Sequence, residues 1–475
     1  MERARRAVFG ARSTSAEGYR PVPGAEQDTA LEESVPRDSH DEIPFSWTEY
    51  CIFGFLGMAM LWAWNMFLAA APYFSSRFAS NAWIQTNFQS GILTVSTVTN
   101  LGVLIILSNM QDSASYSFRI NLALVMNSIV FALLTASTTL FLDASPAGYF
   151  VFLLAMVGLS SWATGLIQNG AFAFTASYGR PEYMQALMAG QAVAGVLPAV
   201  AQVATVLLFP PQDPASSSSS PAAITTTTKS TEGPEHGGKR GESSAFLYFL
   251  AAVTISVTAL AALVPLLRRH NRRVQNKQAA SPRPSTDEAE RASRKATSLW
   301  ILFRKLRWLA VGVAVTFAVT MFFPVFTAKI HSVREHDPGA WPLFRPAAFV
   351  PLGFAFWNLG DLSGRMATML PLSPHRHLAP FTLFLLAVGR VALLPLYLLC
   401  NVRGRGAVVP SDVFYLFVVQ LVFGLTNGWL GSSFMMASGQ VVDEAEREVT
   451  GGFMGLFLVI GLTVGSLLSF TASGI

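Results

Sequence analysis

Apolar blocks of about 20 residues or more recur along the chain, separated by stretches rich in charge, proline or glycine. A helix needs about 20 residues to cross the hydrocarbon layer of a membrane, so each block predicts a membrane-spanning helix. Only 13% of the side chains are charged, about half the share in a typical soluble domain. We therefore expect an all-α polytopic membrane protein with eleven transmembrane helices. The expected spans are 46–70, 87–110, 117–141, 148–178, 182–210, 245–267, 305–330, 345–370, 378–401, 411–437 and 449–473.

Two long polar segments divide these spans into a group of six and a group of five. Residues 211–244 are rich in Ser, Thr and Pro, and residues 268–304 are basic. The expected domains are a disordered cytosolic N-terminal tail (1–44), a six-helix bundle with the exposed Ser/Thr-rich loop (45–267), a basic cytosolic linker (268–304) and a five-helix bundle (305–475).

The basic residues predict how the chain is oriented in the membrane. From 268 to 307 there are twelve Lys or Arg against three acids, and the positive-inside rule assigns such a segment to the cytosol. With eleven crossings, the amino terminus is then cytosolic and the carboxyl terminus is not. Because this topology accounts for the net charge of +5, we expect no nucleic-acid partner. The lipid bilayer is the expected surrounding.

One expected span, 345–370, carries polar side chains at helical spacing. Asn358, Asp361 and Arg365 fall at i, i+3 and i+7, on one face of a helix. An ionised side chain at mid-membrane costs about 2.5–3.5 kcal/mol on insertion scales, so such groups usually face the bundle interior and mark a solute or ion path. Arg390 in the next span lies at similar depth, so both arginines are candidate partners of Asp361.

Uncharged polar side chains occur on other spans, namely Asn65, Gln168, Gln191 and Asn427. Amides from several helices can converge on a polar solute at the centre of a bundle. Trp64 is either an interface anchor or a flat surface for an aromatic ring. A purely structural ion pair that joins two helices is the alternative explanation for the charged residues, and it is compatible with transport.

Two further features concern helix packing and bending. Gly190 forms a small-residue pattern with Ala186 and Ala194, and such spacing lets helices approach closely. Pro324 lies inside the span 305–330, where it removes a backbone donor and predicts a bend. A bent helix would suit a gate.

Sequence motifs of enzymes do not occur in the chain. It has no Gly-x-Ser-x-Gly, no His-Glu-x-x-His and no Walker A loop. All seven histidines lie outside the expected spans, which disfavours an intramembrane metal site with histidine ligands. We therefore expect no enzyme activity, no catalytic residues, no metal site and no cofactor.

Eight motifs follow one another along the spans. They are "WNMF" in the first span, "GLIQNGAF" in the fourth, "PEYMQALMAGQAVAG" in the fifth, "FFPVFTAKI" in the seventh, "FWNLGDLSGR" in the eighth, "GRVALLPLYLLCN" in the ninth, "GLTNGWLGSSFMM" in the tenth and "GGFMGLFLVIGLTVGSLLSF" in the last. In this order they make the chain resemble the equilibrative nucleoside transporter family over residues 46–473, apart from the two long polar segments. The pattern Asn-x-x-Asp-x-x-Gly-Arg in the eighth span is the most specific.

The resemblance implies a major-facilitator-like fold, with six helices and five arranged around a central cavity. It implies facilitative transport of nucleosides, with nucleobases as a further substrate class, in the plasma membrane or a vacuolar or lysosomal membrane. In the family, the residues matching Trp64, Gln168, Asp361 and Arg365 line the substrate site. Those matching Asn65, Gly190, Phe323, Asn358 and Asn427 affect transport or its integrity, and we add Pro324 and Arg390 as supporting or gating residues.

Alternating access of the two halves about a mid-membrane site is the expected mechanism. A desolvated acid can titrate near neutral pH while a nearby arginine opposes this, so proton coupling stays open. Two other functions remain as alternatives. One is a major-facilitator transporter of another polar solute, and the other is a membrane receptor or sensor that binds a solute without moving it.

Overall fold

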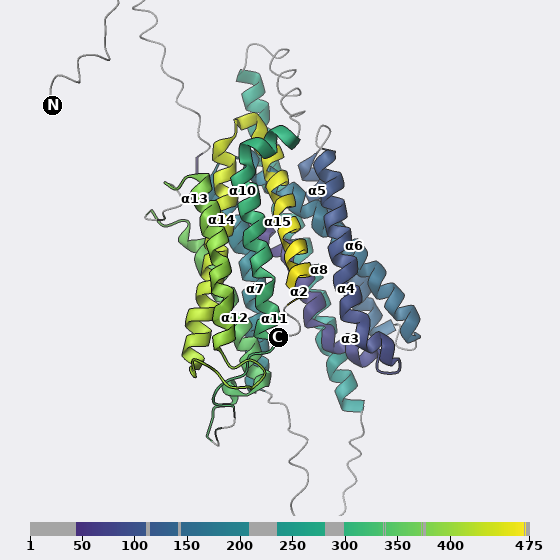
Figure 1. Ribbon diagram of the computed structural model, residues 1–475. Coiled ribbons are helices and arrows are strands. Elements are labelled where there is room, and N and C mark those ends of the chain that lie inside the picture. The colour runs from purple at the N-terminus through teal and green to yellow at the C-terminus, as the bar shows by residue number, and fades with distance from the viewer. Residues whose placement is uncertain are drawn as a thin grey trace, which may run out of the picture. The chain divides into compact units, whose positions relative to one another are not determined.

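The computed structural model of the chain is almost entirely helical (Figure 1). It describes residues 44–471 apart from 111–114, 141–143, 209–234, 281–298 and the positions 336, 338, 372, 374–376 and 470. Nearly all of the predicted N-terminal tail, most of the Ser/Thr-rich loop and about half of the basic linker therefore lie outside the described residues.

Six spans precede the basic linker. They are formed by α2 (Trp47–Ala69) with the short α3 (Ala71–Arg77), α4 (Ala82–Asn109), α5 (Tyr116–Leu140), α6 (Pro146–Ser177), α7 (Pro181–Leu208) and α8 (Glu235–Ala280). Asn81 and Ser145 cap the starts of α4 and α6, where each side-chain oxygen accepts a hydrogen bond from the backbone N–H three residues later. These six spans are called the N-terminal half below.

The helices after the linker, called the C-terminal half below, are less regular. They are α10 (Leu299–Thr320) with α11 (Phe322–Thr327), α12 (Pro346–Ala367), α13 (Pro380–Gly389) continued by the 3₁₀ helix η4 (Arg390–Leu399), the π-helix η5 (Phe414–Leu421) continued by α14 (Val422–Val441), and α15 (Arg447–Ser469). The short turns η2 (Pro342–Phe344) and η6 (Glu444–Glu446) precede α12 and α15.

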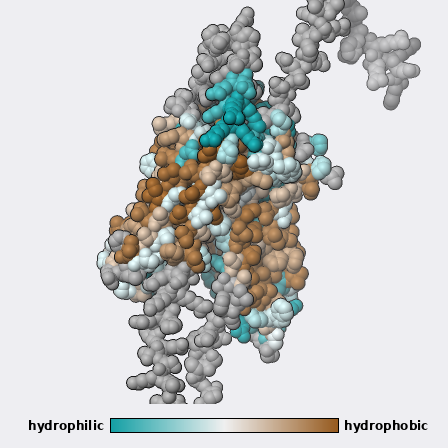
Figure 2. Space-filling model, turned by 180° about the vertical axis from the view of Figure 1, so that it is seen from behind, coloured by the Kyte–Doolittle hydropathy of each residue, from teal (hydrophilic) through white to brown (hydrophobic). Residues whose placement is uncertain are grey.

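Ten of the described helices, several with their short continuations, are long and apolar enough to cross a membrane. Helix α12 is not among them, because its polar face lowers its hydropathy. Its 22 residues are nevertheless about 33 Å long, enough to span the hydrocarbon layer, and it packs along α7 and α14. With α12 counted, the described chain has the eleven predicted spans. Figure 2 shows hydrophobic side chains covering the flanks of the helices and hydrophilic ones gathered where α8 projects.

Helix α8 is longer at both ends than the predicted span 245–267. On its basic extension, Arg273 forms an ion pair at 2.8 Å with Glu49, which is fully buried at the start of α2. Tyr183 at the start of α7 also donates a hydrogen bond to Glu49. The helix continues beyond its apolar residues because such contacts hold its charged extension against the bundle. We call this end of the molecule, where α8 ends and α10 begins, the linker end.

The helix that contains Pro324 is interrupted, as the sequence predicted. Helix α10 ends at Thr320 and α11 begins at Phe322. Proline has no N–H to donate to the carbonyl of Thr320 four residues earlier, so the regular hydrogen-bond pattern cannot continue. The interruption sets the direction of α11 separately from that of α10.

Glycines let two pairs of helices approach closely. A methyl group added at Gly190 on α7 would lie 1.8 Å from the carbonyl oxygen of Gly54 on α2. One added at Gly428 on α14 would lie 1.9 Å from the carbonyl oxygen of Asp361 on α12. Gly190 therefore has the packing role that its small-residue spacing predicted.

The two halves meet where α7 packs on α12 and where α6 packs on α15. On α6 and α15, the contact includes Gly451, where an added methyl group would lie 2.3 Å from the carbonyl oxygen of Phe172. Gly451 lies near the start of α15 and Phe172 near the end of α6, so this contact is at the linker end. The division of the chain into separate six-helix and five-helix bundles stays a prediction.

Candidate functional site

Asp361 and Arg365 form a buried ion pair on α12. The Nε of Arg365 donates to Oδ2 of Asp361 at 2.8 Å, and their side chains are 4% and 6% exposed, the acid being the lower. Gly428, which packs on the backbone of Asp361, lies midway between Phe414 and Val441. The pair is therefore level with the middle of the span formed by η5 and α14, and it is enclosed by protein, the setting in which intramembrane charges are tolerated.

The second oxygen of Asp361 is held from α14. Nδ2 of Asn427 donates to Oδ1 of Asp361 at 2.7 Å, and Oδ1 of Asn427 accepts from the hydroxyl of Thr320 on α10 at 2.6 Å. Arg390 donates from Nη1 to the carbonyl of Thr316 at 2.7 Å and from both Nη atoms to Thr320 Oγ1 at 3.4 Å. Of the two candidate arginines, Arg365 pairs with the acid, while Arg390 is connected to it through Thr320 and Asn427.

Arg365 also reaches the N-terminal half. Its Nη1 donates to the main-chain carbonyl of Met188 at 2.7 Å and to Oε1 of Gln191 at 3.4 Å, both on α7. In return, Nε2 of Gln185 donates to the carbonyl of Arg365 at 3.1 Å. Among the residues that the structure describes, Nη2 of Arg365 has no hydrogen-bond partner. The ion pair thus joins the two halves and keeps one donor available.

Two asparagines meet α7 at neighbouring positions. Nδ2 of Asn65 on α2 donates to the carbonyl of Ala194 at 2.7 Å. Asn358 on α12 donates to the carbonyl of Phe354 on its own helix, and its Oδ1 would lie 2.3 Å from a methyl group added at Gly195. Asn65 and Asn358 therefore position α7 between α2 and α12, close to the ion pair.

The described contacts of Gln168 and Trp64 lie within the N-terminal half. Gln168 is buried on α6 and accepts a hydrogen bond from Asn100 on α4 at 3.4 Å. Trp64 is half-buried and packs against a cluster of buried hydrophobic side chains. The structure does not bring these two side chains into described contact with Asp361 or Arg365.

Phe323 lies on α11, just after the interruption of its helix. Its ring stacks on Trp357 of α12 with a centroid distance of 4.0 Å and an interplanar angle of 4°. Trp357 precedes Asp361 by one helical turn, so this stack connects α11 to the helix that carries the ion pair.

A hydrogen-bonded hub in the C-terminal half was missed by the sequence analysis. Gln420 is fully buried, and its Nε2 donates to the hydroxyls of Thr327 and Tyr415, each at 2.6 Å. Its Oε1 accepts from the hydroxyl of Tyr397 at 3.0 Å. The hub joins α11, η4 and η5. A lone amide in the apolar run "FYLFVVQLVF" is the same signal that singled out Gln168, and it could have identified Gln420.

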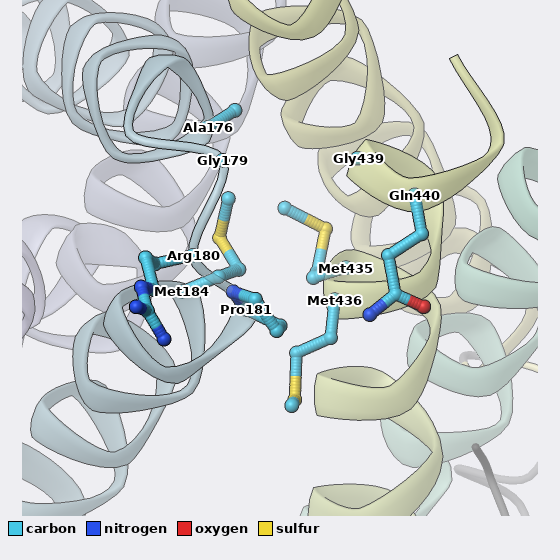
Figure 3. A pocket seen from close by; sticks show the side chains of 9 residues that line it. All are labelled: Ala176, Gly179, Arg180, Pro181, Met184, Met435, Met436, Gly439 and Gln440. Carbon is cyan, nitrogen blue, oxygen red and sulfur yellow. The ribbon is translucent and has the colours of Figure 1, made fainter. Parts of the chain in front are cut away.

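A small cavity lies between the halves at the linker end (Figure 3). It is lined from the N-terminal half by Ala176, Gly179, Arg180, Pro181 and Met184, and from the C-terminal half by Met435, Met436, Gly439 and Gln440. In the described part of the chain, no group of three or more His, Cys, Asp or Glu side chains could hold a metal ion.

Sequence comparison relates most of the chain to known transporters. The family model described as "Nucleoside transporter" matches residues 154–219 and 224–473. "Nucleoside transporter FUN26" of Saccharomyces cerevisiae is 28% identical over 482 residues, covering 92% of this chain and 87% of the yeast protein. "Equilibrative nucleoside transporter 2" of Homo sapiens is 26% identical over 495 residues, covering 92% of this chain and 98% of the human protein.

Solved structures share the fold at low sequence identity. A variant of the E. coli fucose:proton symporter FucP aligns with a TM-score of 0.52 at 13% identity, covering 90% of this chain and 92% of the symporter. The proton:xylose symporter XylE aligns with a TM-score of 0.54 at 10% identity, covering 90% of this chain and 88% of the symporter. FucP and XylE are both major facilitator superfamily transporters. The predicted major-facilitator-like fold is therefore confirmed.

Proposed function

The chain belongs to the nucleoside transporter family, and from this premise we propose that it moves nucleosides across its membrane by facilitated transport with alternating access. The observation that carries the mechanism is the ion pair of Asp361 and Arg365, which is buried at the boundary between the halves and hydrogen-bonded to both. A polar solute that bound there would be in contact with the two parts that have to move.

The chemistry of the pair suits a ribose. The Asp361 carboxylate can accept hydrogen bonds from ribose hydroxyls, and Nη2 of Arg365 can donate to ribose oxygens. The amide of Gln168 offers both a donor and an acceptor to a base edge, and Trp64 offers a flat surface to a ring. We propose these four as the substrate-binding residues, with nucleobases as a further substrate class.

The same hydrogen bonds suggest how binding and opening are linked. In this structure the hydrogen bond of 2.7 Å from Arg365 to the carbonyl of Met188 holds α12 against α7. A solute that draws Arg365 and Asp361 into new hydrogen bonds weakens this link between the halves. A ligand can shift a conformational equilibrium only through such a difference in contacts between the two states. Bound nucleoside therefore favours opening of the linker end.

The multi-pass chain is an integral membrane protein, and we propose that its linker end faces the cytosol. The amino terminus is then cytosolic and the carboxyl terminus is not, because twelve basic residues between 268 and 307 disfavour translocation. The plasma membrane and a vacuolar or lysosomal membrane are the two proposed locations. Imaging a tagged protein distinguishes them.

Flux into liposomes tests the function. Purified protein should admit labelled uridine until the inside concentration equals the outside concentration, and unlabelled nucleosides should compete whereas hexoses should not. Competition by hexoses alone would favour a transporter of another polar solute. Saturable binding without net flux would favour a receptor. Protein with Asp361→Asn serves as the negative control.

Proton coupling is tested in the same liposomes with an imposed pH gradient. Uridine that accumulates above the outside concentration only when the gradient is present demonstrates coupling. A final level that is the same with and without the gradient excludes it.

A further inference from the structure

The linker-end cavity lies on the line that leads from the ion pair out of the molecule. Met184 precedes Met188 by one turn of α7, and Met188 supplies the carbonyl that Arg365 binds. On α14, Met435 follows Asn427 by about two turns, with Gly431 between them. The cavity is therefore about 6 Å from the ion-pair level along α7 and about 12 Å from it along α14, at 1.5 Å per residue.

A layer of side chains separates the cavity from the ion pair. A methyl group added at Gly431 would lie 3.3 Å from the ring of Phe317 and 3.8 Å from the thioether methyl of Met188. Phe317 comes from α10, Met188 from α7 and Gly431 from α14, so three helices meet at this level. The path between the halves is therefore blocked here in this structure.

The cavity itself is bordered by methionines from both halves. Figure 3 shows Met184 of α7 and Met435 of α14 facing each other, with Met436 beside them. Methionine side chains are flexible and apolar, so they fill an irregular gap without making hydrogen bonds that must be broken when the helices separate. Such a layer excludes water when closed and rearranges readily when the two walls move apart.

Next to the methionines of the cavity, the side chain of Arg447 reaches from the C-terminal half to the N-terminal half. It is the first residue of α15, and a methyl group added at Gly179 in the turn between α6 and α7 would lie 2.2 Å from its Nη1. Gly179 has a positive φ of 65°, which favours glycine. The turn therefore needs glycine for its backbone conformation, and a methyl group added there would displace the guanidinium that packs on it.

Buried polar atoms near this contact lack partners among the residues that the structure describes. They include Nε of Arg447, the hydroxyl of Tyr178 and Oε2 of Glu182, which follows the same turn. A buried polar atom without a hydrogen bond destabilises the state that buries it, and water can hydrate it once the halves separate. Hydration of these groups on opening therefore offsets part of the packing that is lost when Arg447 leaves the turn.

We propose that Met184, Met188, Met435 and Met436 form the linker-end gate of the transport path, and that Arg447, packed on Gly179, holds this gate closed. The proposal rests on the proposed alternating-access transport. It adds the residues that seal one side of the path and the contact that controls them. In the open state the two pairs of methionines separate and Arg447 leaves the α6–α7 turn.

Chemical labelling of a cysteine in the gate tests this directly. Met436→Cys is made with Cys51→Ser, because Cys51 is exposed, whereas Cys400 is kept because it is buried. A membrane-impermeant thiol reagent is added on the linker side of oriented vesicles, without nucleoside, and the rate of modification is measured. Protein with Cys51→Ser alone gives the background that Cys400 contributes.

The parent is the protein with Met436→Cys and Cys51→Ser, and we expect its cysteine to be modified slowly. The rate should be about tenfold higher after Gly179→Ala or Arg447→Ala, since each removes the same contact between the halves. The double variant should react no faster than the faster single variant, because the two changes are not independent. Gly439→Ala is the matched control. It borders the same cavity, but an added methyl group there has nothing within 4 Å, so its rate should equal that of the parent.

Three results would each overturn the gate proposal. The first is a modification rate in Arg447→Ala that equals the rate of the parent. The second is an acceleration by Gly439→Ala as large as that by Gly179→Ala. The third is a double variant in which the accelerations by Gly179→Ala and Arg447→Ala multiply. Because Arg447→Ala does not alter the backbone of the turn, it keeps the test valid if Gly179→Ala fails to fold.

Uridine flux in the same vesicles separates the gate proposal from the proposed function. Accelerated labelling without any uridine flux supports the gate and refutes the transport function. Normal flux with labelling at the parent rate supports the transport function and refutes the gate.

Discussion

Arg365 on α12 donates a hydrogen bond from Nη1 to the main-chain carbonyl of Met188 on α7 at 2.7 Å. The same guanidinium donates from Nε to Asp361 at 2.8 Å. One planar group therefore connects the acid of its own helix to the backbone of a helix from the other half. A guanidinium can do this because its donors are fixed in a fork, which a lysine ammonium does not reproduce.

Arg365→Lys should reduce transport although it keeps the positive charge. The ammonium cannot reach Asp361 and Met188 together in the geometry of the arginine, and losing a hydrogen bond to a charged group costs about 1.5–3 kcal/mol. We expect initial uridine flux to fall about tenfold or more. Arg272→Lys, an exposed position on α8, is the control. Wild-type flux in Arg365→Lys would contradict the role of the fork.

Asp361→Asn should abolish measurable transport while the protein still assembles. The amide has the shape of the acid but leaves the Arg365 charge buried without its counterion, and breaking a buried pair in this way costs about 3–5 kcal/mol. Flux of uridine should fall by at least about a hundredfold. Ser363→Ala on the same helix, where an exposed hydroxyl bonds its own backbone, should transport normally. An active Asp361→Asn protein would remove this residue from the site.

Thr320→Val should destabilise the protein, because the change removes the hydroxyl that connects Asn427 to Arg390. The shape is retained, but an oxygen of Asn427 is left without its donor, which costs about 1–3 kcal/mol. Thermal unfolding in detergent measures the loss. Thr254→Val removes an exposed hydroxyl that bonds its own helix, and it should unfold at the wild-type temperature. Equal unfolding temperatures for the two variants would refute the connection.

Gly190→Ala should lower stability by about 1–3 kcal/mol, the usual effect of overpacking. Its new methyl group would lie 1.8 Å from the backbone oxygen of Gly54, which cannot move without shifting α2. At Gly102 on α4, an added methyl group has nothing within 4 Å, so Gly102→Ala should be neutral or stabilise the helix by up to about 1 kcal/mol. Unfolding temperatures in detergent compare the two variants, and a stable Gly190→Ala protein would argue against the close packing of α2 on α7.

Gln420→Leu should destabilise the C-terminal half. Leucine keeps the bulk but leaves the buried hydroxyl of Tyr397 without its acceptor and that of Tyr415 without its donor, at a cost of about 1–3 kcal/mol for each. Unfolding in detergent again provides the measurement. Gln85→Leu changes an exposed glutamine on α4 and should have little effect. If both variants unfold alike, the hub contributes nothing to stability.

The spans were predictable because their signal is local. Hydropathy and length locate most of the helices from α2 to α15, since a helix in lipid satisfies its own backbone and needs only a sufficient run of apolar residues. The eighth span shows the limit of this signal. Its polar face lowers the hydropathy of α12 below that of the other spans, so its apolar block predicted a span that an average over the whole helix does not single out.

The partners of the polar side chains were not predictable, because depth along a helix does not specify its rotation or its neighbours. Arg365 and Arg390 are at similar depth, yet Arg365 is the one that forms the ion pair with Asp361. The 3₁₀ helix η4 and the π-helix η5 have no comparably clear sequence signal, although Gln420 on η5 stands out in its apolar run.

By itself, the sequence determined that this chain is a helical membrane protein with charged residues inside one span, and its ordered motifs indicated the family. These properties depend on residues close together along the chain. Only the tertiary structure decided that Arg365 bonds Met188, that Thr320 and Asn427 join Arg390 to the acid, and that Arg447 packs on Gly179. Those contacts join residues far apart in sequence, and they arise from how the helices rotate and approach one another as they pack.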